Sequence, residues 1–79
     1  MSYKGIIVRD PKILLGKPTI KGTRISVELI MKKLAGGSTF HDILNSYPHL
    51  SKEQIEAACD YAAEVINSAS YSEKSLNSY

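Results

Sequence analysis

The chain of 79 residues has a single cysteine, no tryptophan and no long run of hydrophobic residues. One thiol cannot form an internal disulfide, so Cys59 excludes a disulfide-stabilised fold and fits a reducing compartment. No apolar run approaches the roughly 20 residues that a membrane-spanning helix requires. The first eleven residues lack the apolar region and cleavage site of a signal peptide. We therefore predict one soluble, cytoplasmic domain, near the size at which a single core is only just sufficient.

The sequence also lacks a recognisable catalytic or metal-binding motif. No spacing of cysteine and histidine matches a zinc site. His41 and Asp42 are neighbours on a predicted helix, which rarely directs both side chains to one target, and His49 falls in a turn. Cys59 lies on a predicted buried face with no flanking cation to activate its thiol. We expect no enzymatic activity, no metal and no cofactor.

The net charge of +2 conceals an uneven distribution along the chain. Residues 1–33 contain eight Lys or Arg and two acidic residues, a balance of +6. Residues 34–79 contain two Lys and six acidic residues, a balance of −4. A basic half is typical of nucleic-acid binding, but a solvated basic surface beside an acidic neighbour explains it equally well.

The amino-terminal third, residues 3–25, predicts short strands and turns. Residues 6–8 form a β-favouring run, and residues 13–15 form a second apolar run before a glycine. Residues 19–25 predict a tight loop or hairpin turn in which Gly22 adopts a positive φ. Because strands this short are marginal alone, we expect them to pair with each other, with the helices or with a second copy.

Residues 27–35 predict the first helix. Ser26 is a suitable amino-terminal cap, and the glycines at 36 and 37 end the helix. Apolar residues recur at helical spacing and define a stripe that we expect to be buried, made of Val27, Ile30, Met31, Leu34 and Ala35.

Residues 38–59 predict a short helix, a tight turn and a longer helix. Thr39 can cap the short helix, and Pro48 cannot continue it. Ser51 and Gln54 form a capping box that starts the longer helix. Two helices joined in this way form a helix-turn-helix, the shape that places a helix in the DNA major groove. The predicted fold class is α+β, mainly α: short amino-terminal strands followed by a three-helix, homeodomain-like or winged helix-turn-helix domain over residues 1–67.

The longer helix, predicted from Lys52 to about Asn67, has two contrasting faces. The expected buried face contains Ile55, Ala58, Cys59, Ala62 and Ile66. The opposite face carries four carboxylates, interrupted by Tyr61. Because DNA repels carboxylates, we expect only the first turn of this helix to reach a duplex. The acidic face is expected either to meet a basic partner or simply to be solvated.

The basic stretch GKPTIKGTRI is the most distinctive segment of the sequence. Lys17, Lys21 and Arg24 lie on a backbone stiffened by Pro18, and could contact phosphates as point charges and as a bidentate fork. The spacing does not match a P-loop. A turn-rich linker with solvated lysines remains the alternative.

This stretch, continued as SVELIMKKLAGG and followed by Asp42-Ile43-Leu44, Tyr47-Pro48 and Leu50-Ser51, resembles the small prokaryotic family called domain of unknown function 433. The resemblance runs from about Ile6 to Ile66. That family is similar to VapB-like antitoxins of type II toxin–antitoxin modules, which are often paired with PIN-like ribonuclease toxins. The resemblance implies a helix-turn-helix domain that binds a toxin and its own operator, without assigning a role to any single residue.

We therefore predict a homodimeric antitoxin that neutralises a PIN-like ribonuclease by direct binding and also binds operator DNA. The expected DNA contacts are Lys17, Lys21, Arg24, Lys52 and Gln54. The expected toxin contacts are Glu53, Glu56, Asp60, Tyr61, Glu64 and Tyr71, the last on a serine-rich tail, residues 68–79, that we expect to be flexible. A stand-alone DNA-binding transcription regulator and a protein-interaction module without DNA binding remain the alternatives.

Overall fold

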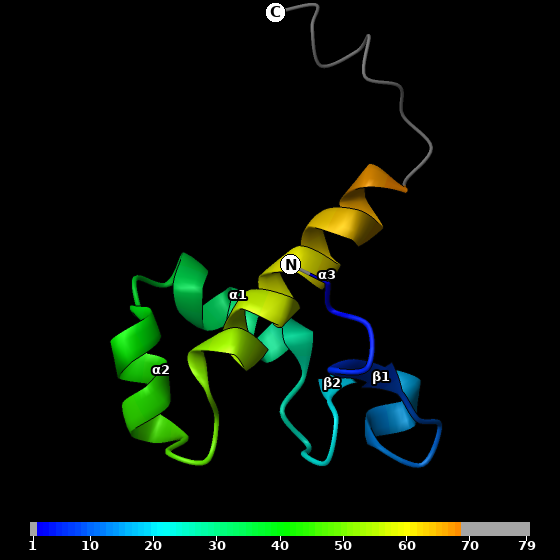
Figure 1. Cartoon of the computed structure of the whole chain (residues 1–79), viewed down its shortest axis with the longest axis horizontal. Helices are drawn as coiled ribbons and strands as arrows, with labels where there is room; N and C mark the ends of the chain where they lie inside the picture. The colour runs from blue at the N-terminus through cyan, green and yellow to red at the C-terminus, as the bar shows by residue number, and fades with distance from the viewer. Residues whose placement is uncertain (1, 69–79) are drawn as a thin grey trace, which may run out of the picture.

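The computed structural model describes residues 2–68 and, within them, places two short strands ahead of three α-helices (Figure 1). Strands β1 (Ile7–Arg9) and β2 (Pro18–Ile20) pair antiparallel, with Ile7 opposite Ile20. The helices are α1 (Val27–Ala35), α2 (Phe40–Ser46) and α3 (Lys52–Asn67). This arrangement confirms the predicted α+β, mainly α fold class.

Each helix begins at a side chain that accepts a hydrogen bond from a backbone N–H of the first turn, as the sequence predicts. Ser26 Oγ accepts from Leu29 N–H of α1 at 3.0 Å. Thr39 caps α2 in the same way, and the Asp42 side chain accepts a hydrogen bond from Thr39 N–H, which completes a capping box. At α3, Gln54 N–H donates to Ser51 Oγ at 3.3 Å and Ser51 N–H donates to Gln54 Oε1 at 2.8 Å. These caps satisfy donors that a helix leaves without intrahelical partners.

Replacing Ser51 with alanine tests the contribution of the α3 cap. We expect Ser51→Ala to lower the free energy of unfolding by about 1 kcal/mol, because the N–H of Gln54 loses its acceptor. Urea unfolding followed by far-UV circular dichroism measures the change. Ser46→Ala is the matched control, since Ser46 is exposed in the last turn of α2. Equal losses in the two variants would contradict a specific capping role.

The hydrophobic core lies where α1 packs against α3 and the sheet. Four isoleucines are fully buried, and each comes from a different element: Ile20 from β2, Ile30 from α1, Ile43 from α2 and Ile55 from α3. At the edge of this core, the rings of Tyr3 and Tyr61 meet edge to face, with centroids 5.0 Å apart. This contact joins the amino-terminal segment to the middle of α3.

Part of the predicted core is wrong, because α3 extends beyond the body that covers its first half (Figure 1). Ile66 is 58% exposed, although helical spacing predicts it to be buried. Cys59 and Ala62 are half-buried, and Ala35, at the end of α1, is exposed. Ala57 is fully buried, although its position lies off the predicted stripe.

The apolar run at residues 13–15 does not form a strand, which corrects the expectation of extended structure there. It contributes to a single 3₁₀ turn, η1 (Leu14–Gly16), in which Leu14 and Leu15 have φ angles of 49° and 57°. The chain must reverse direction between the paired strands, and the turn begins with the backbone bond from Ile13 N–H to Asp10 O at 2.9 Å. Reversal therefore overrides the β preference of this apolar run.

The second reversal, after β2, follows the prediction. Gly22 has a φ of 81°, a conformation that favours glycine. The backbone N–H of Ile20 donates to Ile25 O at 2.9 Å, and Thr19 pairs with Ser26 in an isolated antiparallel bridge. None of the helices within residues 2–68 combines the length and apolar character needed to cross a bilayer.

Candidate nucleic-acid and partner surfaces

The loop after β2 holds two of the predicted DNA contacts on a fixed backbone. Thr23 Oγ donates to Ile20 O at 2.8 Å and accepts from Ile25 N–H at 3.0 Å. These bonds close the loop around Gly22, while the side chains of Lys21 and Arg24 are exposed. Neither side chain forms an ion pair with another described residue. The geometry therefore presents an ammonium and a guanidinium group to solvent from a short, internally bonded turn.

Lys17 differs from these two cations, because its charge is already paired. Its Nζ lies 2.8 Å from Glu28 Oε1, and Lys32 Nζ lies 3.1 Å from Glu28 Oε2. The hydrogen bonds and charges of Lys17 and Lys32 lower the pKa of Glu28. The predicted role of Lys17 as a phosphate contact thus competes with its ion pair to Glu28, which joins the residue before β2 to α1.

The pairing of Glu28 predicts a contribution to stability that depends on pH. Because its pKa is lowered in the folded state, the contribution is present above the unfolded-state pKa, close to 4.5, and is lost as pH falls through the folded value. We expect Glu28→Gln to flatten the decline in unfolding free energy below about pH 4.5. Urea midpoints measured from pH 7 to pH 3 test this. Parallel curves for the two proteins would show that the ion pair contributes nothing.

The turn between α2 and α3, residues 47–51, gathers a cation and two aromatic rings. Lys33 Nζ lies 5.7 Å from the centroid of the Tyr47 ring, and the His49 ring meets Tyr47 edge to face at 6.5 Å. The contact of Lys33 with Tyr47 joins α1 to the residue that ends α2, so it cannot be read from local sequence, which predicts His49 only as a turn residue. Lys52 is exposed in the first turn of α3, directly after this cluster.

The two predicted DNA contacts on α3, Lys52 and Gln54, differ in how accessible their side chains are. Lys52 is free to reach a ligand, whereas Gln54 is half-buried and its Oε1 accepts from Ser51 N–H. In Figure 1 the turn 47–51 and the loop 21–24 both extend to the same end of the molecule, away from the carboxyl end of α3. The basic loop and the first turn of α3 can be presented together to one extended ligand.

The predicted acidic face of α3 is present, with one change. Glu53 and Glu64 are exposed, Glu56 and Asp60 are half-buried, and none of the four forms an ion pair within residues 2–68. Tyr61, expected on this face, instead packs its ring against Tyr3. Tyr71, the remaining predicted partner contact, lies outside the described residues, as does the predicted tail from residue 69 onward.

The part of the chain that the structure describes contains no cluster of His, Cys, Asp and Glu able to hold a metal ion. Partial burial and the nearby carboxylate of Glu56 raise the pKa of the Cys59 thiol. A raised pKa keeps the thiol protonated near neutrality, which opposes use as a nucleophile. The two charged surfaces are thus the basic end, formed by Lys21, Arg24 and Lys52, and the acidic face of α3.

Residues 7–62 match the model of a family described as Protein of unknown function (DUF433). The chain belongs to the DUF433 family. The match includes both strands, the basic loop, α1, α2 and most of α3, so it covers the surfaces described above except Glu64.

Two other proteins contain a region that is similar to this chain. The chain is 35% identical over 57 residues to the uncharacterized protein y4eO of Sinorhizobium fredii, covering 72% of this chain and 26% of that protein. It is similar to the crystal structure of a DUF433 member from Anabaena variabilis, with a TM-score of 0.74 and 28% identity, over 77% of this chain and 60% of that one. The chain therefore spans about a quarter of the curated relative and three fifths of the solved chain.

Proposed function

We propose that this DUF433 protein is the antitoxin of a type II toxin–antitoxin module in the cytoplasm. It neutralises a PIN-like ribonuclease by direct binding and binds operator DNA. The observation that supports this proposal best is the separation of unpaired charge. Exposed cations extend from the basic end, at Lys21, Arg24 and Lys52, whereas unpaired carboxylates follow α3. Two surfaces of opposite sign suit two partners of opposite sign.

The DNA half of the proposal relies on the basic end. Lysine and arginine side chains neutralise phosphates and supply the sequence-independent part of affinity. In a helix-turn-helix the helix that follows the turn enters the major groove, and here α3 follows the turn 47–51 with Lys52 exposed in its first turn. The carboxylates begin at Glu53 and continue along the helix. DNA is therefore bound by the loop 21–24 and the start of α3, not by the length of α3.

The toxin half relies on the acidic face. A ribonuclease that binds the RNA backbone needs a cationic surface around its active site. Carboxylates at Glu53, Glu56 and Asp60 are complementary to such a surface, and charge complementarity accelerates association and orients the partners. Occupation of that surface by α3 excludes RNA, which is how binding becomes inhibition.

A pull-down from the native cells tests this proposal. The tagged full-length chain is the bait, and proteins recovered in near-stoichiometric amount are identified by mass spectrometry. A variant with Glu53→Lys, Glu56→Lys and Asp60→Lys is the matched bait, because its substitutions lie on a surface away from the fully buried isoleucines. We expect a small ribonuclease with the first bait and its loss with the second.

The outcomes separate the candidate functions. A recovered nuclease whose RNA cleavage is inhibited by the purified chain supports the antitoxin. Recovery of specific DNA without a nuclease supports a transcription regulator, and recovery of neither leaves a protein-interaction module. Binding of the nuclease equally by both baits would remove the acidic face from the interface.

A further inference from the structure

The turn 47–51, which joins α2 to α3, holds an exposed aromatic ring that the proposed function does not use. His49 is exposed, and its ring meets the half-buried ring of Tyr47 with centroids 6.5 Å apart and planes at 88°. Because the planes are nearly perpendicular, the two rings do not stack on each other, and Tyr47 leaves at least one face of the imidazole uncovered. The turn therefore presents to solvent a flat ring on which another planar group can stack.

The backbone and the neighbours of this ring are held in place by the rest of the domain. The backbone N–H of Leu50 donates to Tyr47 O at 2.9 Å, which closes the turn, and the Leu50 side chain is buried. Tyr47 packs against the core, and Lys33 Nζ lies 5.7 Å from the centroid of its ring. Pro48 fixes the backbone φ angle between the two rings. Because the turn is ordered before a ligand arrives, binding there costs less conformational entropy.

Several cations accompany the ring. Lys33 lies over Tyr47 and Lys52 directly follows the turn, and neither forms an ion pair with another residue in the range 2–68. The loop 21–24, with its exposed cations, extends to the same end of the molecule (Figure 1). An aromatic ring among lysine and arginine side chains is typical of surfaces that bind single-stranded nucleic acid, where bases stack on rings and cations follow the backbone.

The acidic face of α3 favours a single strand over a duplex as the ligand of this ring. The bases of a duplex are already stacked on one another, whereas unpaired bases are free to stack on an aromatic side chain. A rigid duplex that follows α3 also meets the carboxylates from Glu53 onward. A flexible strand can cross from the loop 21–24 to His49 without following α3, so it avoids most of this repulsion.

We propose that the turn 47–51 binds an unpaired base of a single-stranded nucleic acid whose phosphates lie on the basic end. The His49 ring supplies the stacking face, and Tyr47 holds that ring in position. The phosphate contacts rest on the DNA half of the proposed function, whereas the ring contact extends it to a ligand that operator binding does not require. RNA and DNA strands share this chemistry, so both serve as probes.

Two replacements of His49 separate stacking from other contacts. Fluorescence anisotropy of the full chain with a labelled oligouridine of about 12 nucleotides measures the affinity. His49→Ala is expected to weaken binding about ten-fold, because one base loses its stacking partner. His49→Phe keeps a flat ring without the imidazole nitrogens, and should bind within about two-fold of the parent chain. A hydrogen bond or phosphate contact made by the imidazole would be lost in both variants.

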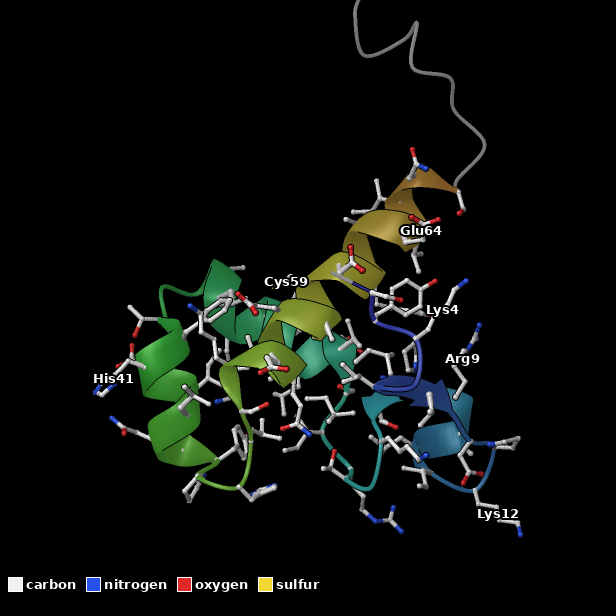
Figure 2. The ribbon with its side chains drawn as sticks, viewed as in Figure 1. Lys4, Arg9, Lys12, His41, Cys59 and Glu64 are labelled. Atoms are coloured by element: carbon white, nitrogen blue, oxygen red, sulfur yellow. The ribbon has the colours of Figure 1, made fainter. Side chains whose placement is uncertain are left out.

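The second histidine of the chain provides the matched control. His41 is also exposed, but it lies in the first turn of α2, whereas the turn 47–51 follows the last turn of that helix. Figure 2 shows His41 on the outer side of α2. His41→Ala removes the same side chain and should leave the affinity for oligouridine unchanged. Far-UV circular dichroism of all three variants checks that each is folded like the parent chain.

Two further probes compare the ligands. A duplex of mixed sequence offers no free base face, so His49→Ala should change its affinity by less than about two-fold. Oligodeoxyuridine of the same length as the oligouridine lacks only the 2′-hydroxyl groups. Equal affinity of the parent chain for the two strands is expected, because stacking and phosphate contacts are common to both. Tighter binding of the ribose strand, with the same loss in His49→Ala, supports the stacking site and identifies RNA as its ligand.

Two results overturn the stacking site. The first is absence of binding to either strand at about 50 mM salt, where phosphate contacts are strong. The duplex then decides separately whether the DNA half of the proposed function survives. The second is a loss in His49→Ala that is equal for strand and duplex, or equal to the loss in His49→Phe, since either shows that the imidazole does not act as a stacking ring.

Discussion

Ile30→Ala is expected to destabilise the domain by about 3 to 4 kcal/mol. Ile30 is fully buried on α1, the helix that contacts β2, α2 and α3. Removing three carbon atoms there leaves a cavity between elements that cannot all move inward together. In a domain of this size such a loss is a large share of the total stability, so we expect a substantial unfolded population at 37 °C. Urea unfolding followed by circular dichroism measures it.

Ile66→Ala is the matched control, because it deletes the same atoms from a helix of the same domain. At 58% exposure, Ile66 buries little of its side chain, and its replacement should cost under about 1 kcal/mol. The comparison is made at protein concentrations where both variants have the same oligomeric state. Equal losses for the two variants would place Ile66 in the core, as helical spacing alone predicts.

The features that sequence predicted well are those decided by neighbouring residues. Ser26, Thr39 and Ser51 cap the three helices because each cap bonds a backbone N–H only three residues away. Gly22 adopts the predicted positive φ for a similar reason, since the loop closes through a backbone bond from Thr23 N–H to Ile20 O. Local chemistry suffices for such elements, and the order of strands and helices follows from them.

Whether a residue is buried depends on how far its helix or strand extends along its neighbours. The spacing of apolar residues in the sequence carries no information about that extent. The stripe on α3 has the spacing of a core face through Ile66, yet the body of the domain ends before that residue. The apolar run at residues 13–15 is misjudged for a related reason. β1 and β2 pair antiparallel, so the chain between them must reverse direction. That requirement comes from the tertiary structure and not from the residues of the run itself.

The residues of the candidate site show the same division between local features, which the sequence predicts, and contacts between remote segments, which it does not. Exposure of Lys21, Arg24 and Lys52 follows from polar residues in turns and at a helix start, and the structure places them as expected. The ion pair of Lys17 with Glu28 and the stacking of Tyr61 on Tyr3 join segments that are remote in sequence. The first contact pairs the charge of Lys17, whose side chain stays exposed, and the second leaves Tyr61 half-buried.

The double variant Lys21→Ala with Arg24→Ala is expected to weaken binding to a labelled 20-base-pair duplex of mixed sequence by roughly 50-fold at 0.1 M salt. Two phosphate contacts are lost together, so the slope of log affinity against log salt should fall by about 2. The loop is closed by backbone atoms and by the Thr23 hydroxyl, so both substitutions leave its geometry unchanged. Fluorescence anisotropy from 50 to 200 mM salt measures affinity and slope.

The control is Lys4→Ala with Lys12→Ala, which removes the same net charge from the edge that carries Lys4 and Lys12 in Figure 2. The two double variants are compared at concentrations where light scattering gives the same oligomeric state. If DNA meets the basic end, the control retains the parent slope and loses affinity only slightly through the weaker overall field. Equal slopes for both variants would show that binding reports total charge and that the loop 21–24 is not a contact. No binding by the parent chain at 50 mM salt would remove DNA from the proposal and leave the acidic face of α3 as the functional surface.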